Sequence, residues 1–205
     1  MAQNGNKKGY LEIIIGPMFS SKTTTILQMY KQCVFCNISV SIINHSIDQR
    51  YHNTMISSHD KIMAPCFQVN KLSDIWRYNS NNTYSNNISY NDYEILRNSD
   101  VILINEGQFF DDLFEVVNEM VNCGKKLYVC GLDGDFEKNK FGQILDLIPN
   151  CDKVNKLTSL CSLCKNGTKA IFTMRLTNEK EQTIVGITNY IPVCRECYKT
   201  QNKLL

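Results

Sequence analysis

Residues 16–23, Gly-Pro-Met-Phe-Ser-Ser-Lys-Thr, place a glycine, a lysine and a hydroxyl at the spacing of a phosphate-binding loop. In such a loop, backbone N–H groups at the N-terminus of a helix donate hydrogen bonds to a phosphate. Lys22 would add a positive charge on the outer phosphates, and the Thr23 hydroxyl would be a magnesium ligand. Ser21 replaces the second glycine of the pattern, and a positive φ there would cost roughly 1 to 2 kcal/mol. On this stretch alone, a chance similarity without chemistry is the alternative.

A carboxylate follows another apolar segment. Residues 101–104 are Val-Ile-Leu-Ile, and Asn105 and Glu106 come directly after them. In enzymes with a phosphate-binding loop, acidic residues at this place organise magnesium and activate the nucleophile. Asn105 replaces the first acid, and its amide can hydrogen-bond a magnesium-bound water but cannot neutralise the ion. Glu106 is therefore the candidate general base for an attacking hydroxyl.

Two C-x-x-C pairs lie near the C-terminus. They are Cys161 with Cys164 and Cys194 with Cys197, separated by residues 165–193. In a reducing compartment this spacing is a strong signature of tetrahedral zinc, and disulfides are the alternative. Four thiolates leave no open coordination position, so the metal would be structural. Its apparent binding energy of about 10 to 16 kcal/mol could hold together an appendage with a small core.

Other candidate ligands have simpler explanations. Cys33 and Cys36 also form a C-x-x-C, but no second pair is near, so core or helix-end cysteines are favoured over a redox pair. The three histidines, His45, His52 and His59, fall in one region, and a metal cluster made from them is the less favoured interpretation. The nearby charged residues are ordinary loop charges in one interpretation, or ligand contacts at the end of a parallel strand in the other. They are Asp48, Arg50, His59 and Asp60.

Apolar runs alternate with segments of helical period. We expect strands over residues 11–15, 38–44, 101–104 and 126–131, and helices over 24–36 and 111–123. This alternation favours an α/β fold in which helices flank a parallel sheet. We divide the chain into a P-loop ATP-binding domain, residues 1–157, and a small zinc-binding domain, residues 158–205.

Two further stretches carry no chemistry by themselves. Residues 79–92 are rich in asparagine, and we expect a loop with too few apolar residues to contribute to the core. Phe136 and Phe141 lie in the loops after the fourth strand, and taken alone they are more typical of core than of ligand contacts.

Length and composition limit the class of protein. At 205 residues with 43% hydrophobic residues, the chain is globular, with one or two domains. The 22 basic and 20 acidic residues give no strong field for nucleic acid or a membrane surface. The polar N-terminus lacks the apolar core of a secretion signal, and no run is long enough to span a membrane. We expect a cytoplasmic protein whose ten cysteines are reduced or bind metal.

Taken together, these motifs resemble one family. GPMFSSKT, NEGQFF, LDGDF (132–136), KFG (140–142) and the C-x-x-C pairs occur in the order found in zinc-containing thymidine kinases of cellular and large-DNA-virus type. The resemblance covers the chain from about Leu11 to Tyr198. It implies transfer of the ATP γ-phosphoryl group to the 5′-hydroxyl of thymidine, a salvage step that supplies DNA synthesis. It also implies structural zinc, magnesium with ATP, a homotetramer and feedback inhibition by dTTP.

The resemblance also implies roles for individual residues. Glu106 resembles the catalytic base. The residues that resemble the ATP, phosphate and metal contacts are Gly16, Pro17, Met18, Phe19, Ser20, Ser21, Lys22, Thr23, Asp48, Arg50, Asn105 and Gln108. Those that resemble the thymidine pocket are Met18, Phe109, Leu132, Phe136 and Phe141, together with a lasso that closes over the base, namely Gln182, Thr183, Ile184, Val185, Gly186 and Tyr190.

The chain departs from the family pattern in several places. Ser21 and Asn105 replace a glycine and an acid, and we expect these changes to affect the handling of ATP and magnesium. Asp135 stands where the family usually has threonine and Gln182 where it usually has an aliphatic residue, and the lasso is one residue shorter before Tyr190. These changes are expected to alter the size or polarity of the base pocket. A catalytically impaired nucleotide-binding regulatory protein is the alternative function, and a zinc-ribbon nucleic-acid binder is a third.

Overall fold

The computed structural model describes residues 8–48, 54–58, 60–77, 88–177, 179, 181–182 and 189–201. Its elements, in chain order, are β1 (Tyr10–Ile15), α1 (Lys22–Phe35), β2 (Val40–His45), β3 (Met55–Ser57), β4 (Met63–Pro65), β5 (Phe67–Val69), α2 (Leu72–Trp76), α3 (Tyr90–Asn98), β6 (Val101–Ile104), η1 (Gly107–Phe109), α4 (Leu113–Asn122), β7 (Lys126–Gly131), η2 (Ile144–Asn150), β8 (Lys153–Lys156), β9 (Ser159–Leu160), β10 (Lys169–Ala170), β11 (Phe172–Arg175), β12 (Tyr190–Val193) and α5 (Arg195–Gln201).

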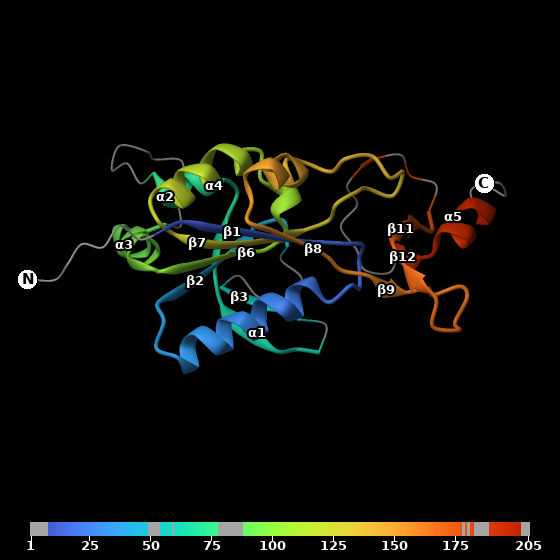
Figure 1. Ribbon diagram of the computed structural model, residues 1–205, viewed down its shortest axis with the longest axis horizontal. Coiled ribbons are helices and arrows are strands. Elements are labelled where there is room, and N and C mark those ends of the chain that lie inside the picture. Colours follow the sequence, from blue (N-terminus) through green and yellow to red (C-terminus); the bar gives the residue numbers. More distant parts are fainter. Residues whose placement is uncertain are drawn as a thin grey trace, which may run out of the picture.

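A six-stranded sheet with the order β5-β2-β6-β7-β1-β8 forms the centre of the molecule, and all its strand pairs are parallel. Its central strands β1 and β6 are buried and apolar except for Glu12, because both faces of the sheet are covered. One core lies between the sheet and α2, α4 and η2, and a second lies between the sheet and α1. Figure 1 shows α1 on one side of the sheet and α2 and α4 on the other. The predicted parallel α/β fold is confirmed.

Strand register brings the predicted chemical groups to one edge of the sheet. Ile15 at the end of β1 pairs with Gly131 at the end of β7. Ile104 at the end of β6 pairs with Val129, two residues before the end of β7. Since the carboxyl ends of parallel strands share an edge, the loops after β1, β6 and β7 all begin there. We call this edge the active edge, because the predicted chemical groups gather there.

The C-terminal part has a small core of its own. Two antiparallel ribbons, β9 with β10 and β11 with β12, pack with α5 around a cluster that includes Ala170, Val193 and Tyr198. Figure 1 shows this part beyond the end of the sheet where β8 leads into β9. The boundary at residue 158 stays a prediction.

The sequence interpretation missed the short elements of the α/β part, which are β3, β4, β5, α2, α3, η1, η2 and β8. It also missed those of the C-terminal part, which are β9, β10, β11, β12 and α5. Residues 79–87 of the asparagine-rich stretch lie outside the described residues, but the loop expectation is wrong for its end. Ser89 and Asp92 form a capping box that starts α3 at Tyr90, and the half-buried Ile88 packs against the core. Within the described chain, no helix is both long enough and apolar enough to cross a membrane.

Candidate active site

The phosphate-binding loop adopts a backbone that its sequence makes costly. Gly16 has φ 153°, and a Cβ there would lie 2.5 Å from the carbonyl oxygen of Leu157. Ser21 has φ 64° and ψ 24°, directly before α1, and its side chain makes no capping hydrogen bond. The structure therefore places Ser21 in the left-handed region predicted to cost roughly 1 to 2 kcal/mol. Phe19, also not a glycine, has φ 61°.

Lys22 points into this loop. Its buried ammonium donates hydrogen bonds to the carbonyl oxygens of Gly16, at 3.0 Å, and Pro17, at 2.7 Å. Ser20 Oγ donates to the same Pro17 oxygen at 2.8 Å. Thr23 lies half-buried in the first turn of α1. The Lys22 cation thus lies at the N-terminus of a helix, and the helix N–H groups there favour a bound phosphate.

A residue from the C-terminal part reaches the phosphate loop. The Met18 N–H donates to Thr173 Oγ1 at 3.0 Å, and Thr173 in β11 is buried. Thr173 was missed by the sequence interpretation, because no local pattern indicates a contact between residues 155 positions apart. The contact fixes the C-terminal part against the active edge.

Glu106 follows β6 with φ 53° and ψ 42°, a left-handed conformation that turns the chain into η1. Gln108 Nε2 donates to Glu106 Oε2 at 2.6 Å, and Gln108 Oε1 accepts the Leu132 N–H at 2.9 Å. Gln108 is buried, and a Cβ at Gly142 would lie 2.1 Å from its carbonyl oxygen. Gln108 thus orients the carboxylate relative to β7. Its predicted contact with phosphate stays a prediction.

Asn105 lies in a buried row of polar side chains across the strand ends. Its Nδ2 donates to Asn44 Oδ1 at 2.8 Å, and its Oδ1 accepts from Cys130 Sγ at 3.0 Å. Asn44 donates in turn to Gln68 Oε1 at 3.2 Å. The carboxamide can satisfy an acceptor and a donor in this row at once, whereas a carboxylate has no proton to donate. The neutral row explains how the chain accommodates an amide where a P-loop enzyme usually has an acid.

Burial controls the ionisation of two groups beside Glu106. Burial, and to a smaller extent the Glu106 carboxylate, raises the pKa of the Cys130 thiol to about 12. Burial lowers the pKa of His45, against smaller opposing effects of Asp111 and Glu106. Cys130 therefore stays a thiol and His45 stays neutral near pH 7. His45 packs on Phe110, with ring centroids 4.8 Å apart, so it has a packing role at this edge.

Aromatic side chains line the same edge. Phe109 and Phe141 meet edge to face, with centroids 5.5 Å apart, and His45 packs on Phe109 at 5.6 Å. Phe141 is buried, so the interpretation as core agrees with its environment, and Phe136 is half-buried. Met18 and Leu132 are half-buried as well. The contact of these side chains with a base stays a prediction.

The buried side chain of Arg175 contacts both ends of the predicted lasso. Arg175 donates to the carbonyl oxygens of Glu179, at 2.8 Å, and Gln182, at 3.1 Å. It also donates to the Tyr190 hydroxyl at 2.6 Å, and its guanidinium lies 3.7 Å from the ring centroid of Phe136. Arg175 was not singled out from the sequence. The predicted site residues outside the described chain are Arg50, Thr183, Ile184, Val185 and Gly186.

The four predicted zinc ligands form one cluster. The Sγ atoms of Cys161, Cys164, Cys194 and Cys197 all lie within 4.8 Å of one another. Tetrahedral zinc with bonds of about 2.3 Å requires sulfur separations of about 3.8 Å, so the set fits the ion. Burial would raise the pKa of Cys161, but N–H groups of Cys164 and Cys194 donate to its sulfur and lower the pKa to about 6. All ten cysteines are described and have free thiols, against the disulfide alternative. The cluster can hold a metal ion.

Comparison with known proteins places this geometry in a family. The model of the family described as thymidine kinase matches residues 9–198. The chain belongs to the thymidine kinase family. It is 39% identical over 194 residues to the thymidine kinase of Yaba monkey tumor virus, covering 94% of this chain and 96% of that protein. The chain is 36% identical over 196 residues to thymidine kinase a of Arabidopsis thaliana, covering 95% of this chain and 76% of that protein. It is 33% identical over 195 residues to the cytosolic thymidine kinase of Gallus gallus, covering 95% of this chain and 79% of that protein.

The other candidate ligands singled out from the sequence are only partly described. Cys33 packs half-buried against the core and Cys36 ends α1, in agreement with the core and helix-end interpretation. His52 and His59 lie outside the described residues. Among those described, the four-cysteine cluster is the one group of three or more potential ligands close enough to share a metal ion. Asp48 follows β2, with its N–H bonded to the carbonyl oxygen of His45.

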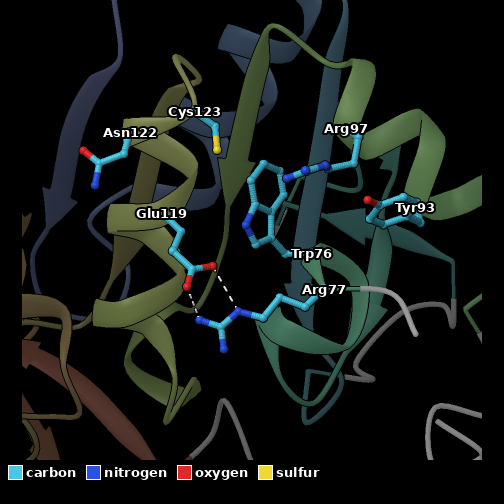
Figure 2. A pocket seen from close by; sticks show the side chains of 7 residues that line it. All are labelled: Trp76, Arg77, Tyr93, Arg97, Glu119, Asn122 and Cys123. Atoms are coloured by element: carbon cyan, nitrogen blue, oxygen red, sulfur yellow. Dashed lines mark hydrogen bonds and ion pairs between the residues drawn. The ribbon is translucent and has the colours of Figure 1, made fainter. Parts of the chain in front are cut away.

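A separate cavity of about 450 Å³ lies between α2, α3 and α4. Figure 2 shows its lining residues, which are Trp76, Arg77, Tyr93, Arg97, Glu119, Asn122 and Cys123. The guanidinium of Arg97 lies 4.2 Å from the Trp76 ring centroid, and Arg77 pairs with Glu119. The charged side chains that line the cavity thus contact each other or an aromatic ring. The cavity lies away from the active edge and holds none of the family motifs.

Proposed function

We propose that this chain transfers the γ-phosphoryl group of ATP to the 5′-hydroxyl of thymidine, giving thymidine monophosphate and ADP. One observation carries the proposal: the Glu106 carboxylate follows a strand at the same sheet edge as the phosphate loop, in a chain of the thymidine kinase family. A primary alcohol is a weak nucleophile, so the reaction needs a base beside it. Glu106, oriented by Gln108, supplies that base.

In the proposed step, the 5′-oxygen of thymidine attacks the γ-phosphorus while its proton passes to Glu106. The bond from the γ-phosphorus to the oxygen bridging to the β-phosphate breaks, and ADP leaves. Lys22 exchanges its contacts with the loop carbonyls for contacts with phosphate oxygens and stabilises the charge of the transferring group. The loop N–H groups after Gly16 add further donors.

We propose that ATP binds together with magnesium. Thr23 and Asp48 offer the oxygen donors that magnesium prefers, and Asn105 is a neutral neighbour in place of a second acid. When bound, magnesium neutralises phosphate charge. With one carboxylate fewer, magnesium affinity is expected to be weaker than with an acid at position 105.

The remaining features are proposed on the same basis. The cysteine cluster holds structural zinc, because four thiolates complete its coordination. The wall of the thymidine pocket is formed by Met18, Phe109, Leu132, Phe136 and Phe141. A homotetramer and inhibition by dTTP follow from the family resemblance, and a cytoplasmic location accords with ten cysteines that are reduced or bind metal. No observation on the described residues favours the impaired regulatory alternative or the nucleic-acid binder.

The test is an assay of the purified, zinc-loaded protein with ATP and magnesium against thymidine, deoxyuridine and deoxycytidine. We expect monophosphate to form from thymidine. Absence of product at any practical enzyme concentration, with nucleotide binding retained, would support the regulatory alternative instead.

Glu106→Gln is the matched variant for the role of the base. Its amide oxygen can still accept the bond from Gln108, so the local structure should persist. We expect kcat to fall by about 10² to 10⁴ and the ATP dissociation constant to stay within about twofold. Unchanged turnover would remove Glu106 as the base.

A further inference from the structure

Two departures from the family pattern, Asp135 and Gln182, contact each other. Gln182 Nε2 donates to Asp135 Oδ2 at 2.8 Å, although the residues are 47 positions apart. Asp135 lies in the loop after β7 at the active edge, and Gln182 lies in the chain between β11 and β12. The hydrogen bond therefore links the sheet to the segment that leaves the C-terminal ribbon.

The carboxylate of Asp135 is held by its own turn as well as by Gln182. Asp135 is buried, and its Oδ1 accepts the N–H groups of Glu137, at 2.9 Å, and Asn139, at 2.8 Å. Its own N–H donates to the carbonyl oxygen of Asn139 at 3.0 Å. One oxygen thus organises the local turn, and Oδ2 faces Gln182. A buried carboxylate needs such donors, because its desolvation is otherwise costly.

Residue 182 is held at two points. Its carbonyl oxygen accepts a bond from Arg175, and its side chain donates to Asp135. Arg175 is itself fixed by its contacts with Phe136 and with the Tyr190 hydroxyl. The main chain at Gln182 is therefore fixed between a cation on β11 and an anion on the β7 loop.

Either substitution alone would break this arrangement. With the aliphatic residue usual in the family at position 182, the Oδ2 atom of Asp135 would lose its side-chain donor in a buried position. With threonine at position 135, the Gln182 amide would lose its charged acceptor. Asp135 is buried and Gln182 is exposed, so the loss of the donor to Asp135 is the costlier of the two changes, because water can replace the acceptor of Gln182. The two departures are thus consistent with each other.

We propose that Asp135 and Gln182 are a matched pair of positioning residues that holds the main chain at residue 182 against the nucleoside pocket and so sets the affinity for thymidine. The inference rests on the proposed function. Since both residues lie on the pocket side and neither contacts the phosphate loop in the described chain, the pair should act on nucleoside binding and leave ATP binding alone.

A reciprocal exchange tests the pair in the full-length, zinc-loaded protein. Gln182→Glu sets two carboxylates against each other, and we expect the KM for thymidine to rise about tenfold. Adding Asp135→Asn restores a donor and an acceptor with the roles reversed, so the double variant should return to within about twofold of the wild type. The KM for ATP should stay within about twofold throughout. Asn166→Asp, in the exposed zinc loop, is the matched control for the added charge, since its Oδ1 can still accept the Thr168 N–H.

Thermal unfolding without ligand separates failure of the pair from failure of the proposed function. Gln182→Glu should lower the Tm by about 2 to 4 °C and the double variant should restore it, whether or not the protein phosphorylates thymidine. A double variant no better than Gln182→Glu in both Tm and KM would overturn the pair. Restored Tm with the same thymidine KM in all variants would overturn the positioning role. A wild type without thymidine turnover would overturn the proposed function alone.

Discussion

Individual residues at the active edge adopt costly conformations that the sequence only partly indicates. The missing glycine at Ser21 indicated that a positive φ there would be costly, and Ser21 does have a left-handed φ of 64°. The equally left-handed Glu106 gave no such signal, since nothing in its sequence neighbourhood requires a turn of that kind. Thr173 and Arg175 were missed for another reason. Their roles arise from contacts with residues on other elements, which local patterns do not encode.

Ser21→Gly should stabilise the protein. Glycine removes a left-handed cost of roughly 1 to 2 kcal/mol and adds about 0.5 to 1 kcal/mol of backbone entropy to the unfolded chain. We expect a net gain of about 0.5 to 1 kcal/mol, measured as a higher urea midpoint at unchanged slope. Ser21→Ala is the control, because it keeps the strain and removes an exposed hydroxyl. A glycine variant less stable than the alanine variant would contradict the strain.

At the scale of elements, the long buried strands and amphipathic helices were predictable, and the short elements were not. The predicted segments 101–104 and 126–131 match β6 and β7. The start of α2 depends on a distant residue, since Asp112 accepts the N–H groups of Leu72 and Ser73 at 3.1 and 2.8 Å. A helix capped by a carboxylate about 40 residues away leaves no capping signal in its own sequence.

The helix that carries the last zinc ligand also contacts the pocket loop. Tyr198 follows Cys197 in α5, and its buried hydroxyl donates to the carbonyl oxygen of Phe136 at 2.7 Å. Its ring packs on Phe172, with centroids 5.2 Å apart. The zinc cluster is therefore one residue and one hydrogen bond away from the wall of the proposed thymidine pocket.

Zinc removal should weaken thymidine binding as well as stability. We expect chelation to lower the Tm and to weaken thymidine binding more than ATP binding, both measured by calorimetry. Tyr198→Phe keeps the four thiols and leaves the Phe136 carbonyl without this donor, at a cost of about 1 to 3 kcal/mol. At full zinc content by metal analysis, this variant should bind thymidine about tenfold more weakly. Equal thymidine affinity in the variant and the wild type would exclude this connection.

For the whole molecule, near-neutral charge means that specific buried groups determine the response to acid. The formal net charge is +2, so general repulsion near pH 7 is small. His45 is packed at the active edge, and burial lowers its pKa despite the opposing charges of Asp111, Glu106 and Asp112. Its contribution to stability is present above the unfolded pKa of about 6.5 and is lost as the pH falls below it, because the unfolded chain then binds the extra proton.

His45→Asn should reduce this acid sensitivity. The asparagine oxygen can still accept the Ile47 N–H that His45 Nδ1 accepts at 3.1 Å, while the titrating ring is removed. We expect the variant to be less stable at pH 7.5, from lost aromatic packing, and its free energy of unfolding to fall less between pH 7.5 and 5.5. Parallel urea curves at both pH values measure this difference. If the free energy of unfolding falls equally between the two pH values in both proteins, His45 is not the acid-sensitive group.

The left-handed backbone at the active edge has a consequence for how this sequence can change. Phe19, Ser21 and Glu106 are three non-glycine residues with positive φ around the proposed chemistry, together costing about 3 to 6 kcal/mol. A domain of this size has a total stability of about 5 to 15 kcal/mol, so the sheet and its two cores must compensate for a large share. Substitutions in those cores that another α/β protein would tolerate therefore unfold this protein more often. The backbone geometry of the active edge therefore limits which substitutions the two cores can accept.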